Sequence, residues 1–363
     1  MQLPQYDDLI PEQLDIYDAS PHENLFVVGP PGSGKTTLAV HRAQMLLRMK
    51  KKTLIITKNR MLTALATQLG DRTIDVSTMH KFVPGDYRYR LQGDIPKQGY
   101  VFDWATIISD YDARPTSPRY DHIIVDEGQN LPHGFYPWLV KHGARYITVF
   151  ADEAQTTDLN ERSTIQDILN APMPRPMHLH NNHRNTREIA MLAQFFHRSQ
   201  VVAPGNVELG HSGTVPRLER FTDWTTVAQD VHIRYLNQNQ SIGVVVRRTR
   251  DVEHLHSLLS QALPIDTRID TYTSEAEPDA EHGISLLSPG ITILTSESVI
   301  GLEFDCVYLQ DLHQSASKLT VEACRRMYML CARAKNDLIL LDGPRPMTQA
   351  ELANLPDDKL LIR

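Results

Sequence analysis

Eight residues near the start of the chain have the types and spacing of a phosphate-binding loop. They read Gly-Pro-Pro-Gly-Ser-Gly-Lys-Thr over 29–36 and fit the pattern G-x-x-x-x-G-K-[ST]. Glycines allow close approach, so successive backbone N–H groups can surround a phosphate. Lys35 is predicted to reach the β- and γ-phosphates, and the Thr36 hydroxyl to complete the coordination of Mg²⁺. The predicted nucleotide-binding residues of this loop are Gly29, Gly32, Ser33, Gly34, Lys35 and Thr36.

Two adjacent carboxylates form a second group that could do chemistry. Asp126 and Glu127 follow the run 122–125, and carboxylates are costly to bury unless they face a cation or water. Asp126 is predicted to hold the hydration shell of Mg²⁺, and Glu127 to take a proton from the water that attacks the γ-phosphate. The alternative is that the pair caps a helix N-terminus. The phosphate loop upstream favours the first interpretation.

The elements that must position these groups alternate between short β-branched runs and helical patterns. This alternation is typical of parallel sheets covered by helices. The loop follows the run 25–28 and precedes a predicted helix over 36–49. The other strands predicted in the first half are 53–57, 74–77, 122–125 and 146–150. A second series is predicted at 177–180, 242–246, 291–294, 306–309 and 338–341.

A proline-rich segment separates the two series of strands. Pro172, Pro174 and Pro176 would be tolerated neither inside a strand nor inside a helix. We therefore expect an α/β fold with two similar units, over 1–171 and 177–363, joined by a linker over 172–176.

The composition is that of an ordinary soluble protein, with 363 residues, 41% apolar and 22% charged. There is no apolar run near the roughly 20 residues needed to span a bilayer, and no basic, apolar leader, which favours the cytoplasm and no membrane association. The three cysteines lack metal-ligand spacing and are expected in the core. The net charge of −7 argues against broad capture of nucleic acid but permits a locally basic groove.

Two segments are candidates for insertions between the regular elements. The segment 84–118 contains Tyr87-Arg88-Tyr89-Arg90, a spacing that could stack bases between cations. The alternative for this segment is an exposed edge strand or ribbon. The acidic, turn-rich segment 273–289 is expected to be a solvated loop.

The order of the motifs resembles that of superfamily 1 helicases of the UvrD/Rep/PcrA type. In the first half, 10–14 resembles the Q motif, 77–82 the Thr-x-His motif, 126–130 the DEAQD box and 151–155 the GDxxQ motif. The resemblance implies two tandem RecA-like P-loop NTPase domains, with the ATP site in the cleft between them. It also implies adenine contact for Gln13, nucleic-acid contact for Thr78 and His80, and γ-phosphate sensing for Gln155.

The second half continues the resemblance. Residues 181–186 resemble the NYRST element, 241–259 motif IV, 301–305 motif V and 328–335 motif VI. The resemblance implies that Arg184 and Arg333 reach the γ-phosphate and that Glu303 touches the ribose. Arginine supplies planar, permanently charged donors, which suit the charge that develops in phosphoryl transfer.

Several positions depart from the family pattern. His183 replaces a tyrosine that stacks on adenine, and Thr37 stands where many relatives have an arginine on the other face of the base. The residues 156–159 include none of the aromatic residues that stack bases in this family. The stretch 295–301, which leads into motif V, resembles the family pattern Thr-x-His-x-x-Lys-Gly. It keeps the threonine, Thr295, as a nucleic-acid candidate, but it lacks the lysine and has Glu297 in place of the histidine. The stretches that hold accessory domains in processive relatives are short, so the chain resembles a bare two-domain motor.

The sequence thus predicts an ATP- and Mg²⁺-dependent superfamily 1 motor that acts on nucleic acid, with single-stranded DNA favoured. It would work in a complex with a partner such as a nuclease, in DNA repair or anti-phage defence. The alternative is an ATP-driven switch subunit that controls a partner nuclease without moving along DNA. A small-molecule kinase shares the phosphate loop but does not explain Gln155, Arg184 and Arg333 in helicase order.

Overall fold

The computed structural model describes residues 3–99, 101–152, 165–198, 204–207, 211–273, 275–277, 279–312 and 319–363. The chain divides into two compact units. The N-terminal unit comprises Gln2–Gly29 and Gly34–Leu179, and the C-terminal unit comprises Pro30–Ser33 and His180–Arg363. The tip of the phosphate loop is therefore grouped with the second half of the chain.

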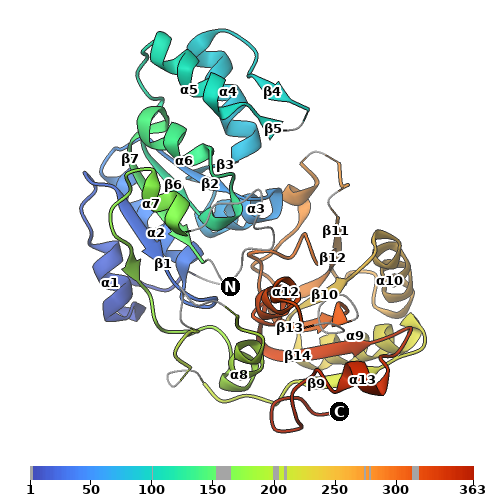
Figure 1. Ribbon diagram of the computed structural model, residues 1–363. Helices are drawn as coiled ribbons and strands as arrows, with labels where there is room; N and C mark the ends of the chain where they lie inside the picture. Colours follow the sequence, from blue (N-terminus) through green and yellow to red (C-terminus); the bar gives the residue numbers. More distant parts are fainter. Residues whose placement is uncertain are drawn as a thin grey trace. The chain divides into compact units, whose positions relative to one another are not determined.

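A parallel sheet forms the core of the N-terminal unit. Its strands are β1 (Leu25–Val28), β2 (Thr53–Thr57), β3 (Asp75–Thr78), β6 (Tyr120–Val125), β7 (Ala144–Ala151) and β8 (Met177–His178). Their order is β3-β2-β6-β7-β1-β8. Every residue of β1 and β2 is buried, as expected for strands with both faces covered. Helices α2 (Lys35–Arg48) and α3 (Arg60–Leu69) pack on the sheet, and α1 (Pro11–Tyr17) packs on α2 (Figure 1).

A second parallel sheet forms the core of the C-terminal unit. Its strands are β9 (Arg217–Arg220), β10 (Ser241–Val246), β11 (Ile269–Tyr272), β12 (Gly290–Thr295), β13 (Phe304–Leu309) and β14 (Ala334–Asp342), in the order β11-β12-β10-β13-β14-β9. The two sheets with their helices confirm the predicted α/β fold. Strands β9 and β11 lie at the edges and escape prediction from the sequence, because they have little of the apolar character of the central strands.

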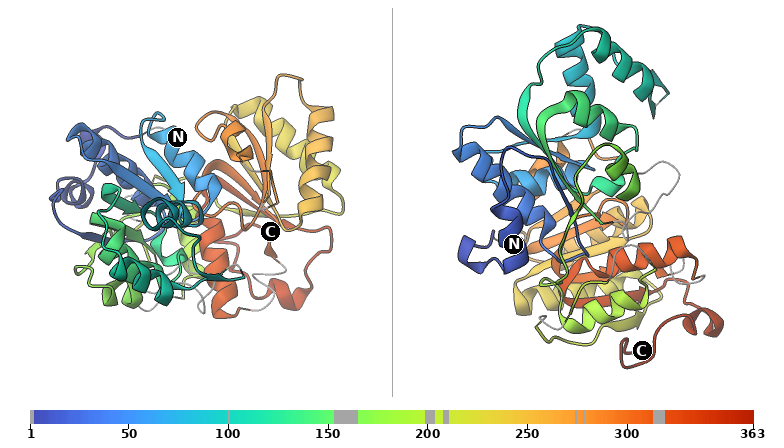
Figure 2. Two further views of the ribbon diagram at one scale, coloured as in Figure 1. Left: turned by 90° about the horizontal axis from the view of Figure 1, so that it is seen from above. Right: turned by 60° about the vertical axis from the view of Figure 1, so that its left-hand side comes forward.

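Two pairs of helices cover the second sheet. Helices α9 (Trp224–Gln238) and α10 (Thr249–Ala262) share one apolar cluster with Ile242, Val244 and Val246. These alternate residues of β10 point to the same face because side chains alternate along a strand. Helices α8 (Arg187–Phe195) and α12 (Val321–Cys331) pack on each other, on the opposite side of the sheet (Figure 2).

The segment 84–118 is a mainly helical insertion with a short two-stranded ribbon, and it adds no edge strand to the first sheet. It contains most of α4 (Met79–Leu91), a hairpin of β4 (Lys97–Gln98) and β5 (Val101–Phe102), and α5 (Trp104–Ala113). Tyr87 is buried and its hydroxyl donates to Asp110 at 2.5 Å, while Arg90 pairs with the buried Asp86 at 3.1 Å. Tyr87 and Arg90 therefore hold the insertion together. These two residues are not available to bases, whereas Arg88 and Tyr89 are exposed, and base stacking by Arg88 and Tyr89 remains a prediction.

The predicted strand 177–180 belongs to the first sheet and does not open the second. Strand β8 pairs in parallel with β1, and the Leu179 N–H donates to the Val28 carbonyl at 2.9 Å. An edge position suits a strand that follows prolines, because one side of an edge strand needs no ladder partner. The second sheet instead begins at β9.

The structure also bears on the predictions for the cysteines, for membrane-spanning helices and for the acidic segment. Cys306, Cys324 and Cys331 are free and buried, which confirms that they are core residues. Among the described residues, no helix is long and apolar enough to cross a membrane. The acidic segment 273–289 is only partly solvated, since Glu281, Ile284 and Leu286 are buried.

Candidate nucleotide and nucleic-acid sites

The phosphate loop joins β1 to α2 with a tight backbone path. Gly32 and Gly34 have φ angles of 78° and 87°, in the left-handed region that glycine tolerates best. Lys35 is the first residue of α2, and its Nζ donates to the Gly29 carbonyl at 2.8 Å. The Ser33 hydroxyl donates to the Pro30 carbonyl at 2.8 Å. The N-terminus of a helix that follows such a turn is a ready site for phosphate.

Thr36 and Asp126 form a pair of oxygen ligands suited to Mg²⁺. The Thr36 hydroxyl donates to Asp126 Oδ2 at 2.8 Å. Neighbouring ligands of an octahedral Mg²⁺ ion lie about 3 Å apart, so this oxygen pair fits the ion. Burial raises the pKa of Asp126, and the adjacent Glu127 carboxylate raises it further. A divalent cation would favour the ionised form of this carboxylate.

Glu127 is held in place by two amide side chains that follow it. Gln129 Nε2 donates to Glu127 Oε2 at 2.5 Å, and Asn130 Nδ2 donates to the same oxygen at 3.4 Å. Gln129 Oε1 accepts the Asp152 N–H at 2.9 Å, which links Glu127 to the end of β7. Glu127 precedes the 3-10 helix η2 (Gly128–Asn130), but in the described structure its side chain makes no capping hydrogen bond. The alternative interpretation as a helix cap therefore lacks support.

Parallel strands bring these groups to one edge of the sheet. Val28 pairs with Ala151 and Val125 with Val149, so β1, β6 and β7 end together. The buried Asp152 lies 3.9 Å from Lys35 Nζ. Asp152 belongs to the motif at 151–155, but the sequence analysis predicted a role only for Gln155 of that motif. Gln155 itself lies outside the described residues.

Gln13 lies against the phosphate loop. Its Oε1 accepts the Ile10 N–H at 3.2 Å, and a Cβ on Gly34 would lie 2.8 Å from Gln13 Nε2. Thr37 is half-buried in the first turn of α2. The proximity of Gln13 to the loop is compatible with adenine contact, which remains a prediction, as does the contact predicted for Thr37.

Two asparagines that sequence reasoning missed surround the tip of the loop in the C-terminal unit. A Cβ on Gly32 would overlap the Asn182 side chain, and the His183 N–H donates to the Gly32 carbonyl at 3.1 Å. Asn182 Nδ2 donates to Asn185 Oδ1 at 2.8 Å, and Asn185 Nδ2 donates to the Ala332 carbonyl at 3.1 Å. The only sequence signal for these residues is their place in the segment that resembles the NYRST element. His183 is half-buried.

The two predicted arginine fingers are both engaged within the C-terminal unit. Arg184 forms an ion pair with Glu303, the residue predicted to touch the ribose, and Lys335 lies 4.0 Å from the same carboxylate. Arg333 is only 2% exposed. Its Nε donates to the Met329 carbonyl at 2.9 Å and its Nη1 to the Leu302 carbonyl at 3.4 Å. Both arginines must exchange these partners to reach a phosphate.

The nucleic-acid candidates differ in accessibility. His80 is exposed and its ring lies 5.6 Å from that of Phe102, while Thr78 is half-buried at the start of α4. Thr295 is buried, and its hydroxyl shares a hydrogen bond with that of Ser298 at 3.1 Å. The roles of these three residues remain predictions.

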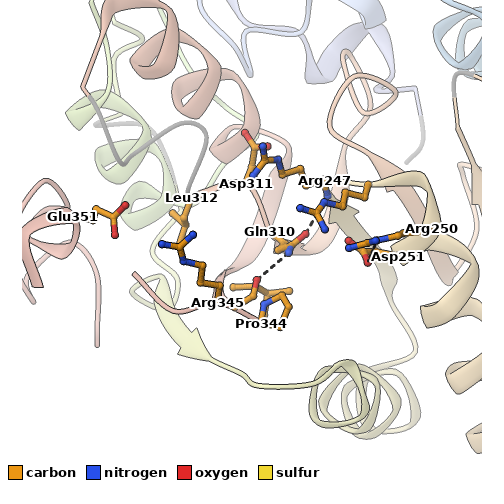
Figure 3. Close-up of a pocket in the computed structure, with 12 residues that line it drawn as sticks. Arg247, Arg250, Asp251, Gln310, Asp311, Leu312, Pro344, Arg345 and Glu351 are labelled. Carbon is orange, nitrogen blue, oxygen red and sulfur yellow. Dashed lines mark hydrogen bonds and ion pairs between the residues drawn. The ribbon is translucent and has the colours of Figure 1, made fainter. Parts of the chain in front are cut away.

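An arginine-rich cavity of about 380 Å³ lies at the carboxyl ends of β10, β13 and β14 (Figure 3). Gln310 lies between Arg247 and the turn after β14, accepting the Arg247 N–H at 3.1 Å and donating to the Gly343 carbonyl at 2.9 Å. The four arginines that line the cavity are Arg247, Arg248, Arg250 and Arg345. Sequence reasoning missed this cluster because Arg345 is distant in the chain from the other three.

A match to a protein family supports the assignment of the phosphate loop. A family model described as an AAA domain matches residues 13–160. The matched segment contains the loop, Asp126, Glu127 and Asp152. Residues 13–160 are thus similar to an AAA domain, and the two parallel sheets give an α/β fold of the RecA-like P-loop kind.

Comparison with individual proteins adds little. No curated protein matches the chain. One solved structure that matches is the C-terminal domain of a possible DNA helicase from Lactobacillus plantarum WCFS1. It is 16% identical, with a TM-score of 0.35, over 50% of this chain and 97% of that one.

Proposed function

We propose that this protein is an ATP- and Mg²⁺-dependent ATPase that acts on nucleic acid as a superfamily 1 helicase-like motor. The observation that carries the ATPase proposal is the joint placement of Thr36, Asp126 and Glu127 at the edge of one sheet. A hydroxyl and a carboxylate 2.8 Å apart suit the metal, and a carboxylate oriented by Gln129 suits a general base. We assign the carboxyl edge of the first sheet to phosphoryl transfer from ATP to water.

Each residue of the site has a separate role in this reaction. Lys35 balances phosphate charge, Glu127 takes the proton of the attacking water, and Thr36 with Asp126 holds the metal. When bound, Mg²⁺ neutralises charge that develops on the β- and γ-phosphates. The remaining catalytic residues in this proposal are Gln155, Arg184 and Arg333.

The arginine cavity supports the nucleic-acid part of the proposal. Arg247, Arg248 and Arg345 gather positive charge at the carboxyl ends of three parallel strands, where α/β sheets commonly bind ligands. Phosphate contacts from arginine supply much of the affinity of nucleic-acid-binding proteins. Four arginines and three carboxylates (Asp251, Asp311 and Glu351) line the cavity, so it has a small excess of positive charge on a chain with a net charge of −7. We favour single-stranded DNA as the ligand and a nuclease as the partner.

ATPase assays with and without single-stranded DNA test the proposal. The purified protein is expected to hydrolyse ATP, and DNA is expected to raise the rate, with a stimulation that weakens steeply as salt increases. An ATPase rate that ignores both DNA and RNA would reject the motor. If such a protein also co-purified with a nuclease, the switch-subunit alternative would replace the motor. Absence of any ATPase activity would reject both functions.

A further inference from the structure

Arg326, a residue with no role in the resemblance described above, joins three segments of the C-terminal unit. It lies on α12, and its Nε donates to Asp311 Oδ2 at 2.7 Å. Its Nη2 donates to the Ser296 hydroxyl and to Glu297 Oε1, the latter at 3.2 Å. The Arg326 side chain is 17% exposed and the Asp311 side chain is fully buried. A guanidinium is suited to this task because its donors form a rigid fork.

The partners of Arg326 come from the proposed nucleic-acid surface. Asp311 follows β13 and lines the arginine cavity. Ser296 and Glu297 directly follow Thr295, the nucleic-acid candidate at the end of β12. Through Asp311, Ser296 and Glu297, Arg326 contacts the arginine cavity and the segment after Thr295. Under the proposed function, nucleic acid would bind at both.

The same helix leads to Arg333. Helix α12 ends at Cys331, and Arg333 Nε donates to the Met329 carbonyl in its last turn. Arg333 Nη1 donates to the Leu302 carbonyl at 3.4 Å. The segment from Ser296 to Leu302 is therefore tied to the α12 region at both ends, by Arg326 at one end and by Arg333 at the other.

We propose that Arg326 is a positioning residue that couples nucleic-acid binding to the placement of Arg333. A nucleic-acid strand in the arginine cavity repels the carboxylate of Asp311, which lines the cavity and pairs with Arg326. Arg326 transmits the resulting shift to the segment 296–302, and Arg333 then exchanges the Leu302 carbonyl for a phosphate. This inference rests on the proposed function, because it takes nucleic acid as the ligand and Arg333 as the finger. Coupling energies of this kind change rates or affinities about 5- to 150-fold.

Kinetics of Arg326→Lys test the coupling. Lysine keeps the positive charge, but it lacks the rigid fork of donors with which Arg326 joins Asp311, Ser296 and Glu297. We expect basal ATPase and the half-saturating DNA concentration to stay within about twofold, while the DNA-stimulated kcat falls about fivefold or more. Glu322→Gln, in the exposed first turn of the same helix, is the matched control and should behave as the wild type. A folded Arg326→Lys protein with wild-type stimulation overturns the proposal.

Hydrogen–deuterium exchange tests the linkage without nucleic acid. Arg326→Lys is expected to raise exchange both in 296–302 and in 327–333, whereas Glu322→Gln raises it in neither. A change confined to 296–297 overturns the linkage. If Arg326→Lys does not fold, Glu297→Gln takes its place, because this exposed carboxylate can be neutralised without removing the pair between Arg326 and Asp311. If DNA fails to stimulate even the wild type, the motor fails, and the exchange pattern alone decides whether Arg326 links the two segments.

Discussion

At the scale of single residues, the adjacent carboxylates of Asp126 and Glu127 differ in their hydrogen-bond partners. Asp126 is bonded to a hydroxyl that can share a metal with it, whereas Glu127 is bonded to the amides of Gln129 and Asn130. Amides orient a carboxylate without neutralising it. These surroundings support the proposed roles, with Glu127 as the general base and Asp126 as a ligand of the cation.

The first prediction concerns this base. Glu127→Gln is expected to keep nucleotide binding and to lower the ATPase kcat by at least about 100-fold, because an amide cannot take a proton from water. Steady-state ATPase and equilibrium binding of a labelled nucleotide measure the two effects. Glu253→Gln, an exposed change on α10, is the control. Turnover near the wild-type rate would remove Glu127 from the mechanism.

The second prediction concerns pH and a buried histidine. Burial, and then the charge of Arg42, lowers the pKa of His122 to about 3. The folded state therefore favours the neutral ring. The stability contributed by the neutral ring is fully present above pH 6.5, the ordinary pKa of histidine. It is lost as the pH falls from 6.5 toward 3. Each pH unit in this window costs up to about 1.4 kcal/mol.

His122→Asn is expected to flatten the fall of Tm between pH 6.5 and 5, and thermal unfolding across that range measures it. His254→Asn, at an exposed position, should leave the slope as in the wild type. Identical slopes for the wild type and His122→Asn would show that His122 does not contribute to acid sensitivity.

At the scale of elements, Arg42 fixes the position of α1 against α2. Its guanidinium donates to the carbonyls of Ile16, Ala19 and Ser20, at 3.3, 3.0 and 2.8 Å. It also donates to the Thr148 hydroxyl on β7 at 2.9 Å. These carbonyls lie in or just after the helix that carries Gln13. Arg42 thus holds Gln13 beside the phosphate loop from a distance.

The third prediction follows from this attachment. Arg42→Met leaves three carbonyls and a hydroxyl without their donors, and is expected to lower the free energy of unfolding by about 2–3 kcal/mol. It should also weaken nucleotide binding through the displacement of Gln13. Denaturant titration and nucleotide titration measure the two effects, with the exposed Arg48→Met on the same helix as control. Unchanged stability would mean that water replaces the guanidinium without loss.

Central strands could be predicted from the sequence, but the edges and the insertion could not. The predicted runs at 25–28 and 53–57 coincide with β1 and β2 because buried parallel strands are continuously apolar. The edge strand β9 has three charged residues that are exposed or half-buried, so it lacks the continuous apolar run of the central strands. The segment around Tyr87 was ambiguous because its polar residues pair within α4 and between α4 and α5, and local pattern does not reveal such partners.

At the scale of the molecule, each predicted arginine finger has partners inside its own unit. Arg184 is paired with Glu303, and Arg333 is bonded to carbonyls of Met329 and Leu302. The contacts of Gly32 with Asn182 and His183 group the loop tip with the same unit. The compact division thus falls after Leu179 and also within the phosphate loop. A proline linker alone could not predict this division.

The fourth prediction concerns the stability of the whole protein with nucleotide and metal. A nonhydrolysable ATP analogue with Mg²⁺ at 100 times its Kd should stabilise the wild type by about 2.7 kcal/mol, because it binds only the folded state. Glu127→Gln should show the same shift in Tm and Lys35→Ala almost none. Removal of Mg²⁺ with EDTA should lower the shift in the wild type. Equal shifts with and without metal would argue against the site at Thr36 and Asp126.

The sequence by itself determined the phosphate loop, the carboxylate pair, the buried central strands and the α/β class, because each depends on residues close together in the chain. Glycine geometry, strand polarity and helix position act over a few residues, so pattern alone predicts them. Only the tertiary structure decided that Gln129 orients Glu127, that Arg184 binds Glu303, that four arginines share a cavity and that Arg326 joins three segments. Apart from Gln129, which is two residues from Glu127, these partnerships join segments that are far apart in the sequence and meet only in the folded chain.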